Sequence, residues 1–316
     1  MVLDDSRRVV VLAGGVGGAK LALGMAQQVA PENLAIIGNV ADDFELYGLH
    51  ISPDLDTVMY TLAGVANPVT GWGIEGDTRQ MLEMMTRYGE TPWFGLGDRD
   101  LATHLLRTGW LACGMTLTDV TARLASALGV ACRLLPATDG PLRTMVDTAE
   151  HGTLGFQEYF VRHRWQPQVE RVWFQREAAC PVTEQARAAL ESADLIAIAP
   201  SNPVLSIEPI LAVDGLRDLV AKRRGPCIVV SPFVAGRAVK GPADKLMREL
   251  SLEHSPRGVA RYYAGLIDGL VIDETDAGAP LPQDVPVLVT STLMVTADDK
   301  ARLAGDVLAF GGKLIQ

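Results

Sequence analysis

The sequence has few cysteines and no recognisable metal motif. Its four cysteines, at positions 113, 132, 180 and 227, are scattered and contain no C-x-x-C pair. That spacing excludes a disulfide framework and a cysteine-based structural zinc site, and it predicts reduced, mostly buried thiols in a cytoplasmic protein. The five histidines are equally dispersed, without the H-E-x-x-H pattern of zinc hydrolases.

Long apolar runs are also missing. No stretch approaches the ~18 consecutive apolar residues of a membrane-spanning helix, so no membrane association is expected. The apolar run 9–13, which follows Arg7 and Arg8, ends at Gly14 and is too short for a secretory signal.

Positively charged residues are fewer than negatively charged ones. The 28 Lys and Arg against 38 Asp and Glu give a formal net charge of −10, which disfavours broad binding to DNA or RNA. A nucleotide can bind such a chain only at a local site that overcomes the overall negative field.

The pattern of apolar residues is that of an α/β protein. Residues 9–13 read as a strand buried on both faces, 20–29 as a helix and 34–37 as a second strand, which together make a right-handed βαβ unit. The same alternation returns late in the 316 residues, where we expect strands at 194–199, 226–230, 269–272 and 285–289 and helices at 211–223 and 297–308.

The middle of the chain has a different pattern. Helices are expected at 78–87, 101–107 and 117–128, followed by mixed segments such as a strand at 169–174. We therefore predict one Rossmann-like domain over 1–316, with a mostly parallel sheet built from both ends of the chain and helices on both faces. A largely helical insertion at about 75–190 would cover the carboxyl edge of the sheet, where such folds bind ligands.

A glycine-rich segment follows the first strand, with Gly14, Gly15, Gly17 and Gly18 ahead of Lys20. Glycines let backbone N–H groups approach a phosphate closely, and a helix N-terminus attracts its charge. The dehydrogenase pattern G-x-G-x-x-G fails because Lys20 stands at its third glycine, and the P-loop pattern fails as well. We predict a phosphate-binding turn of another type; a plain tight turn is the alternative.

Acidic residues cluster after the second strand. Asp42 and Asp43 follow it directly, and Asp54 and Asp56 come shortly afterwards. Magnesium takes one or two carboxylates and fills its remaining positions with water and phosphate oxygens. The cluster therefore predicts a cation site, although Asp56 alone also fits a helix N-cap.

Two further segments carry polar side chains. In GLGDRDLATH (95–104), Asp100 and His104 share one helix face, and Arg99 can grip a phosphate or a carboxylate; the alternative is a helix cap beside an ordinary histidine. Ser201 and Asn202 stand between two prolines after a buried strand, where a plain turn is the alternative. The segment Ser231 to Phe233 repeats that arrangement after the next strand.

Taken together and in order, these segments resemble the 2-phospho-L-lactate transferase family of coenzyme F-420 biosynthesis. The segments that carry the resemblance are GGVGGAK (14–20), NVADD (39–43), ISPDLDTVMYTLAG (51–64), GLGDRDLATHLLR (95–107), APSNPVLSI (199–207) and SPFVAG (231–236). These segments run in order from residue 14 to residue 236, and STLM (291–294) extends the likeness towards the C-terminus.

The resemblance implies a magnesium-dependent transferase. Its donor would be the GDP ester of a small phosphorylated acid, such as 2-phospholactate or phosphoenolpyruvate, and its acceptor the terminal ribityl hydroxyl of the deazaflavin Fo, with GMP released. A separate guanylyltransferase would make the donor, and the enzyme would be a homodimer. The motifs do not indicate which acid is used.

The resemblance also implies roles for single residues. Asp42 and Asp56 would bind magnesium, with Asp43, Asp54 and Asp56 as the catalytic acids. Fo would contact Asp56, Asp98 and Arg99. Phosphate and guanosine would be held by Gly14, Gly15, Gly17, Gly18, Lys20, Ser201, Asn202 and Phe233.

Two other functions are compatible with parts of the sequence. A non-catalytic regulator of the same fold that binds a nucleotide sugar would keep the glycine turn, but it has no need of the acids at 54–56 and 98–100 together. An NAD-dependent dehydrogenase would lack its third glycine here and would have to use Asp42 or Asp43 for the ribose.

Overall fold

The computed structural model describes residues 7–315, and its centre is a sheet of seven strands. The strand order is β14-β13-β10-β9-β1-β2-β5, and every neighbouring pair is parallel. The strands are β1 (Val9–Ala13), β2 (Leu34–Gly38), β5 (Arg133–Pro136), β9 (Leu195–Ile198), β10 (Cys227–Val230), β13 (Gly269–Ile272) and β14 (Val287–Val289). The predicted Rossmann-like architecture, with a sheet assembled from both ends of the chain, is confirmed.

Helices cover both faces of this sheet because the strands are apolar on both sides. In β1, Val9 and Val11 belong to one core and Val10 and Leu12 to the other. The first core is closed by α1 (Gly15–Ala26), α2 (Pro53–Leu62), α5 (Leu117–Ala127) and α11 (Ala297–Leu314). The second is closed by α6 (Glu184–Ser192), α7 (Glu208–Leu211), α8 (Leu216–Ala221), α9 (Ala243–Glu249) and α10 (Pro256–Tyr262).

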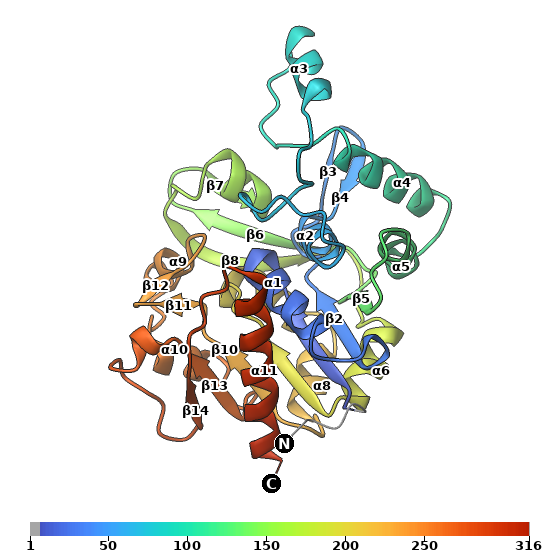
Figure 1. The fold of residues 1–316 in the computed structure, drawn as a ribbon. Coiled ribbons are helices and arrows are strands. Elements are labelled where there is room, and N and C mark those ends of the chain that lie inside the picture. Colours follow the sequence, from blue (N-terminus) through green and yellow to red (C-terminus); the bar gives the residue numbers. More distant parts are fainter. Residues whose placement is uncertain (1–6, 316) are drawn as a thin grey trace.

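The middle of the chain builds a second layer above one end of the sheet (Figure 1). It contains an antiparallel sheet of β6 (Leu142–Thr148), β7 (Gly152–Gly155) and β8 (Val169–Arg176), together with α3 (Gln80–Arg87) and α4 (Asp100–Ala112). Figure 1 shows α3 standing out from the body, while the beginning of β1 and the end of α11 lie at the opposite end. The expected insertion at 75–190 is less helical than predicted, and it includes β5, an edge strand of the main sheet.

Shorter elements complete the fold. Two hairpins pair β3 (Phe44–Leu46) with β4 (Leu49–Ile51) and β11 (Phe233–Val234) with β12 (Arg237–Ala238). Single turns of 3-10 or π-helix are η1 (Pro31–Asn33), η2 (Glu158–Arg162), η3 (Pro203–Ile207) and η4 (Glu274–Asp276).

Two expected helices have different limits. The first begins at Gly15 rather than Lys20, so most of the glycine segment is helical. The helix expected at 211–223 is divided into α7 and α8, because Gly215 between them has a φ of 86°, in the left-handed region that ends or precedes a helix. Among the helices of residues 7–315, none combines the length and the apolar composition needed to cross a bilayer.

Candidate active site

A cavity of about 460 Å³ opens at the carboxyl edge of the main sheet. The residues that follow successive strands line it: Gly14 after β1, Asp42 after β2, Ser201 after β9, Ser231 after β10 and Thr292 after β14. This is the edge at which open parallel sheets bind their ligands. The predicted polar segments therefore do meet in one place, although not every residue in them faces the cavity.

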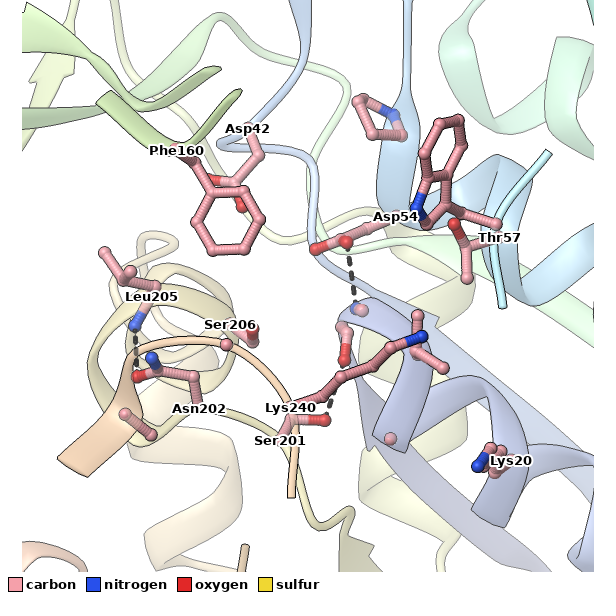
Figure 2. A pocket seen from close by; sticks show the side chains of 18 of the residues that line it. Lys20, Asp42, Asp54, Thr57, Phe160, Ser201, Asn202, Leu205, Ser206 and Lys240 are labelled. Carbon is pink, nitrogen blue, oxygen red and sulfur yellow. Dashed lines mark hydrogen bonds between the residues drawn. The ribbon is translucent and has the colours of Figure 1, made fainter. Parts of the chain in front are cut away.

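The glycine segment forms the first turn of α1 rather than a loop ahead of it. Gly14 is the N-cap, and Gly15 has a φ of 63°, which favours glycine. The backbone N–H of Gly15 donates to Asp54 Oδ1 at 2.8 Å, so an acid of α2 already lies at the positive end of this helix (Figure 2). Gly14, Gly15 and Gly17 line the cavity.

Gly17 and Gly18, two of the predicted phosphate-binding glycines, allow α1 to pack closely against the loop after β9. A Cβ atom on Gly17 would lie 2.2 Å from the carbonyl oxygen of Pro200, and one on Gly18 would lie 2.9 Å from Ser201 Oγ. Ser201 Oγ in turn donates to the carbonyl oxygen of Gly14 at 2.7 Å. Gly18 is buried and is not among the cavity-lining residues. The lack of a side chain at Gly18 therefore allows the close contact between α1 and the loop after β9.

Lys20 lines the cavity, and its ammonium group is bonded to Met294, another residue of the cavity wall. Lys20 Nζ donates to the carbonyl oxygen of Met294 at 2.7 Å. Partial burial lowers the pKa of Lys20, and the charges of Lys240 and Lys300 lower it further. The structure therefore places a group of lysines on this side of the cavity, which the sequence did not predict.

Asp42 and Asp54 are buried acids that face the same space (Figure 2). Asp54 Oδ2 accepts a hydrogen bond from Asn39 Nδ2 at 2.9 Å. Burial raises the pKa of Asp54 to about 6, against the opposing effect of its bonds from Asn39 and Gly15. Burial, and next to it the charge of Asp54, raises the pKa of Asp42 well above its ordinary value.

These two acids fit a divalent cation. Asp42 Oδ1 is buried without a hydrogen-bond partner, which is costly for a carboxylate oxygen. A hard cation such as Mg²⁺ takes oxygen ligands and would relieve both the unpaired oxygen and the repulsion between the two acids.

Asp43 points the other way. Its Oδ2 accepts hydrogen bonds from Ser52 Oγ at 2.7 Å and from His50 Nε2 at 3.0 Å. Asp43 is buried and does not line the cavity. The sequence could not separate it from Asp42, because both follow the same strand; the structure offers only Asp42 to a ligand.

Asp56 is held by a residue that the sequence analysis did not single out. Both carboxylate oxygens of Asp56 accept from the guanidinium of Arg107, Oδ2 from Nη1 at 3.1 Å and Oδ1 from Nη2. Arg107 is 1% exposed, so this is a buried ion pair. The predicted magnesium pair of Asp42 and Asp56 is therefore not the pair that the structure groups: Asp42 lies with Asp54, and the charge of Asp56 is matched by Arg107.

The same helix face carries two more residues of this network. Asp100 and His104 share one face of α4, as their spacing predicted, and Arg107 follows at the next turn. His104 lies between two acids, with Nδ1 3.7 Å from Asp56 Oδ2 and Nε2 3.3 Å from Asp100 Oδ1. Tyr60 OH donates to Asp100 Oδ1 at 2.7 Å. Ligand atoms of Asp56, Asp100 and His104 lie within 4.8 Å of one another, but Arg107 already supplies positive charge there.

Asp98 and Arg99 are not among the cavity-lining residues. Asp98 accepts hydrogen bonds from the backbone N–H groups of Gln80 at 2.9 Å and Met81 at 3.0 Å, at the start of α3. These bonds lower the pKa of Asp98, after the larger effect of its bond from the Thr78 hydroxyl. The predicted contact of Asp98 and Arg99 with the acceptor stays a prediction.

The loops after β9 and β10 supply different parts of the wall. Asn202 lines the cavity, and its Oδ1 accepts from the backbone N–H groups of Val204 at 3.0 Å and Leu205 at 3.1 Å (Figure 2). Phe233 does not line the cavity: it is 1% exposed and packs edge-on against His254. Its neighbour Val234 faces the cavity instead, because successive residues of a strand point to opposite sides.

A wall of aromatic side chains is the largest part of the cavity that sequence reasoning missed. The aromatic side chains that line the cavity include Trp72, Phe94, Phe156, Phe160 and Trp165. They come from three segments, at Trp72, at Phe94 and at 156–165, and only the fold brings these three together. Lys240, which lies between β12 and α9, also lines the cavity and was missed for the same reason.

The chain is similar to known transferases over most of its length. Residues 9–298 match the family model described as 2-phospho-L-lactate transferase CofD. A phosphoenolpyruvate transferase of Streptomyces griseus is 43% identical over 284 residues, which cover 86% of this chain and 87% of that protein. A 2-phospho-L-lactate transferase of Methanocaldococcus jannaschii is 35% identical over 311 residues, which cover 97% and 99%.

A solved structure shares the fold. A UPF0052-family protein of Bacillus halodurans superimposes with a TM-score of 0.60 at 14% identity, covering 96% of this chain and 99% of that one. At this low identity the match supports the fold of the chain and nothing about its chemistry.

Proposed function

The chain belongs to the 2-phospho-L-lactate transferase family, and from that membership we propose that it transfers a phosphorylated acid from a GDP ester to the terminal ribityl hydroxyl of Fo. The observation that carries the proposal is the buried pair Asp42 and Asp54, which faces a cavity at the carboxyl edge of the sheet. Phosphoryl-type transfer needs positioning and charge neutralisation more than covalent help from the protein, and a cation held by these two acids would supply the positive charge.

The proposed reaction is a displacement at phosphorus. The hydroxyl oxygen of Fo attacks the phosphorus that carries the acid, and the bond from that phosphorus to the bridging oxygen breaks. The bridging oxygen leaves with GMP, and the hydroxyl proton passes to a carboxylate of the protein. The product is a phosphodiester between the acid and Fo.

Asp42 and Asp54 would have different roles in the reaction. Asp42, with its unpaired Oδ1, is the residue that would hold Mg²⁺, and the cation would supply positive charge to the diphosphate. Asp54 is the carboxylate that we propose as the proton acceptor, and its pKa of about 6 suits a base near neutral pH. Asp43 has no part in this proposal because it faces His50 and Ser52.

The remaining walls suit the two substrates. Asn202 uses its Oδ1 within the loop, so its amide Nδ2 is left to donate to the nucleotide. The aromatic wall offers flat apolar faces such as Phe160 and Trp165, whose ring centroids are 5.1 Å apart. A deazaflavin ring system would bury its apolar faces against such a surface.

Phosphoenolpyruvate is the donor acid that we propose. Relatives named phosphoenolpyruvate transferase are 39–43% identical to this chain, and those named 2-phospho-L-lactate transferase are 35–37% identical. A guanylyltransferase would supply the donor ester, and the homodimer implied by the resemblance stays a prediction.

Product analysis tests the proposal. The protein is incubated with Mg²⁺ and Fo together with the GDP ester of phosphoenolpyruvate or of 2-phospholactate, and the products are identified by mass spectrometry. We expect GMP and the dehydro phosphodiester from the first donor and less of the saturated product from the second. Absence of both products would contradict the proposed transfer. If the protein also failed to change the fluorescence of Fo, the results would favour the alternative function, a non-catalytic regulator that binds a nucleotide sugar.

A further inference from the structure

Lys240 reaches the N-terminal end of α1 from a distant part of the sequence. It lies in the short link between β12 and α9, at the rim of the cavity, and its side chain extends across the start of α1 (Figure 2). A methyl group built on Gly71 would lie 2.6 Å from Val16 Cγ1 and 3.2 Å from Lys240 Nζ. The ammonium group therefore lies close to the side chain of Val16, in the first turn of the helix.

The ammonium group of Lys240 has unused hydrogen-bonding capacity. Lys240 Nζ donates to the carbonyl oxygen of Thr70, and an ammonium carries three donors, so this contact leaves others for a ligand. Lys20 Nζ likewise has donors left, but it donates to Met294 in the segment before α11, whereas Lys240 Nζ lies close to Val16 in the first turn of α1.

No carboxylate neutralises the lysines on this side of the cavity. Within residues 7–315, no ion pair includes Lys20, Lys240 or Lys300. Burial lowers the pKa of Lys20, and the charges of Lys240 and Lys300 lower it further. In a chain of net charge −10, the ammonium groups of Lys20 and Lys240, with the charge of Lys300 near Lys20, would be stabilised by an anion that binds beside them.

We infer that Lys240, rather than Lys20, is the residue that holds diphosphate charge at the N-terminus of α1. The inference rests on the proposed function for the identity of the diphosphate as part of a donor ester. Lys240 would contact the phosphate oxygens on the side opposite Asp42 and would stabilise the negative charge that collects on the departing GMP. The sequence assigned that role to Lys20 because Lys20 follows the glycines directly.

Binding of inorganic pyrophosphate and of GDP, measured by calorimetry without donor or acceptor, tests the inference. The variants are Lys240→Met, Lys240→Arg and Lys20→Met, with Lys222→Met as the matched control. Lys222 lies on an exposed turn between α8 and β10, at the amino edge of the sheet. Thermal unfolding of each variant separates a loss of binding from a loss of structure at the Thr70 contact.

We expect Lys240→Met to weaken both ligands by roughly 10- to 100-fold, the effect of losing one charge-assisted hydrogen bond. Lys240→Arg should bind within a few-fold of the wild type, Lys20→Met should lose less than Lys240→Met, and Lys222→Met should be unchanged. Unchanged binding by Lys240→Met, an equal loss in Lys20→Met, or no pyrophosphate binding by the wild type would each overturn the inference.

The outcome is independent of the transfer reaction. A protein that binds pyrophosphate through Lys240 but makes no product from Fo contradicts the proposed function and leaves this inference standing. A protein that makes the product, while Lys240→Met binds both ligands as the wild type does, contradicts this inference alone.

Discussion

The backbone N–H of Gly15 donates to Asp54 Oδ1 across 2.8 Å, which places a carboxylate at the positive end of α1. The glycine segment alone suggested that a phosphate would occupy this position. Because Asp54 is buried and its pKa is raised to about 6, its charge is sensitive to protons and to a cation. The acid and the incoming diphosphate repel each other unless positive charge lies between them.

Asp54 should weaken folding at neutral pH when no cation is bound. Its pKa in the folded protein, about 6, is above the ordinary value of 3.8, so the folded state binds a proton more tightly than the unfolded state. The associated stability is present below the ordinary pKa and is lost as the pH rises through about 6. Between about pH 4 and about pH 7.5, the wild type should lose about 2 kcal/mol of unfolding free energy relative to Asp54→Asn.

Urea unfolding in the presence of a chelator measures this difference. Asp218→Asn, which changes an exposed acid of α8, is the control and should track the wild type at both pH values. A difference between the wild type and Asp54→Asn that does not vary with pH would contradict the raised pKa.

Arg107 should be important for stability because it neutralises a buried acid. Arg107→Met leaves Asp56 buried without its partner, and we expect a loss of about 3–5 kcal/mol of unfolding free energy. The double variant Asp56→Asn with Arg107→Met should recover part of that loss, since neither charge remains. If the single and double variants unfold alike, the ion pair is not what Arg107 contributes.

Gly17 should tolerate no side chain. A Cβ atom there would lie 2.2 Å from the carbonyl oxygen of Pro200, so Gly17→Ala must displace α1 or the loop after β9. We expect a loss of about 1–3 kcal/mol. The control is Gly305→Ala in α11, where a Cβ meets nothing within 4 Å and alanine should be neutral or stabilising by about 0.5–1 kcal/mol. Equal melting temperatures for the two variants would show that the close approach is absent.

Phe233 should contribute to stability rather than to nucleotide binding. Because its ring is buried against His254, Phe233→Ala should cost about 3–5 kcal/mol of unfolding free energy. Phe233→Leu keeps most of the buried volume and should bind GDP as the wild type does. A marked loss of GDP affinity in a folded Phe233→Leu protein would instead support the contact between Phe233 and the nucleotide that the sequence suggested.

Most of the sheet could be predicted from the sequence, because every strand except β5 is a short apolar block with its own local signal. Val9–Ala13 is apolar at every position and is followed by a glycine, a pattern that is typical of a short strand buried on both faces. β5 was missed because its apolar block is short and follows soon after helix α5, so that its pairing with β2 is what identifies it as a strand. The division of α7 from α8 depends on the backbone of one residue, Gly215.

The candidate site could be predicted where several polar residues follow a strand. It could not be predicted where the direction of a side chain decides whether the residue faces the cavity. Asp42 and Asp43 are adjacent in the sequence, yet only Asp42 lines the cavity. Arg107 was part of a recognised segment, but its role appears only when α4 packs beside Asp56. Lys240 is far from the glycines in the sequence and joins them only in the folded chain.

The release of GMP from the GDP ester of phosphoenolpyruvate, followed with and without Fo at increasing Mg²⁺, tests the account most directly. We predict that the wild type releases GMP only when both Fo and Mg²⁺ are present. Asp42→Asn should lower kcat/KM by roughly 100-fold, because it removes a cavity-lining acid whose buried Oδ1 has no hydrogen-bond partner and would hold the cation. Wild-type rates from Asp42→Asn, or release of GMP that does not depend on Fo, would contradict the proposed site and reaction.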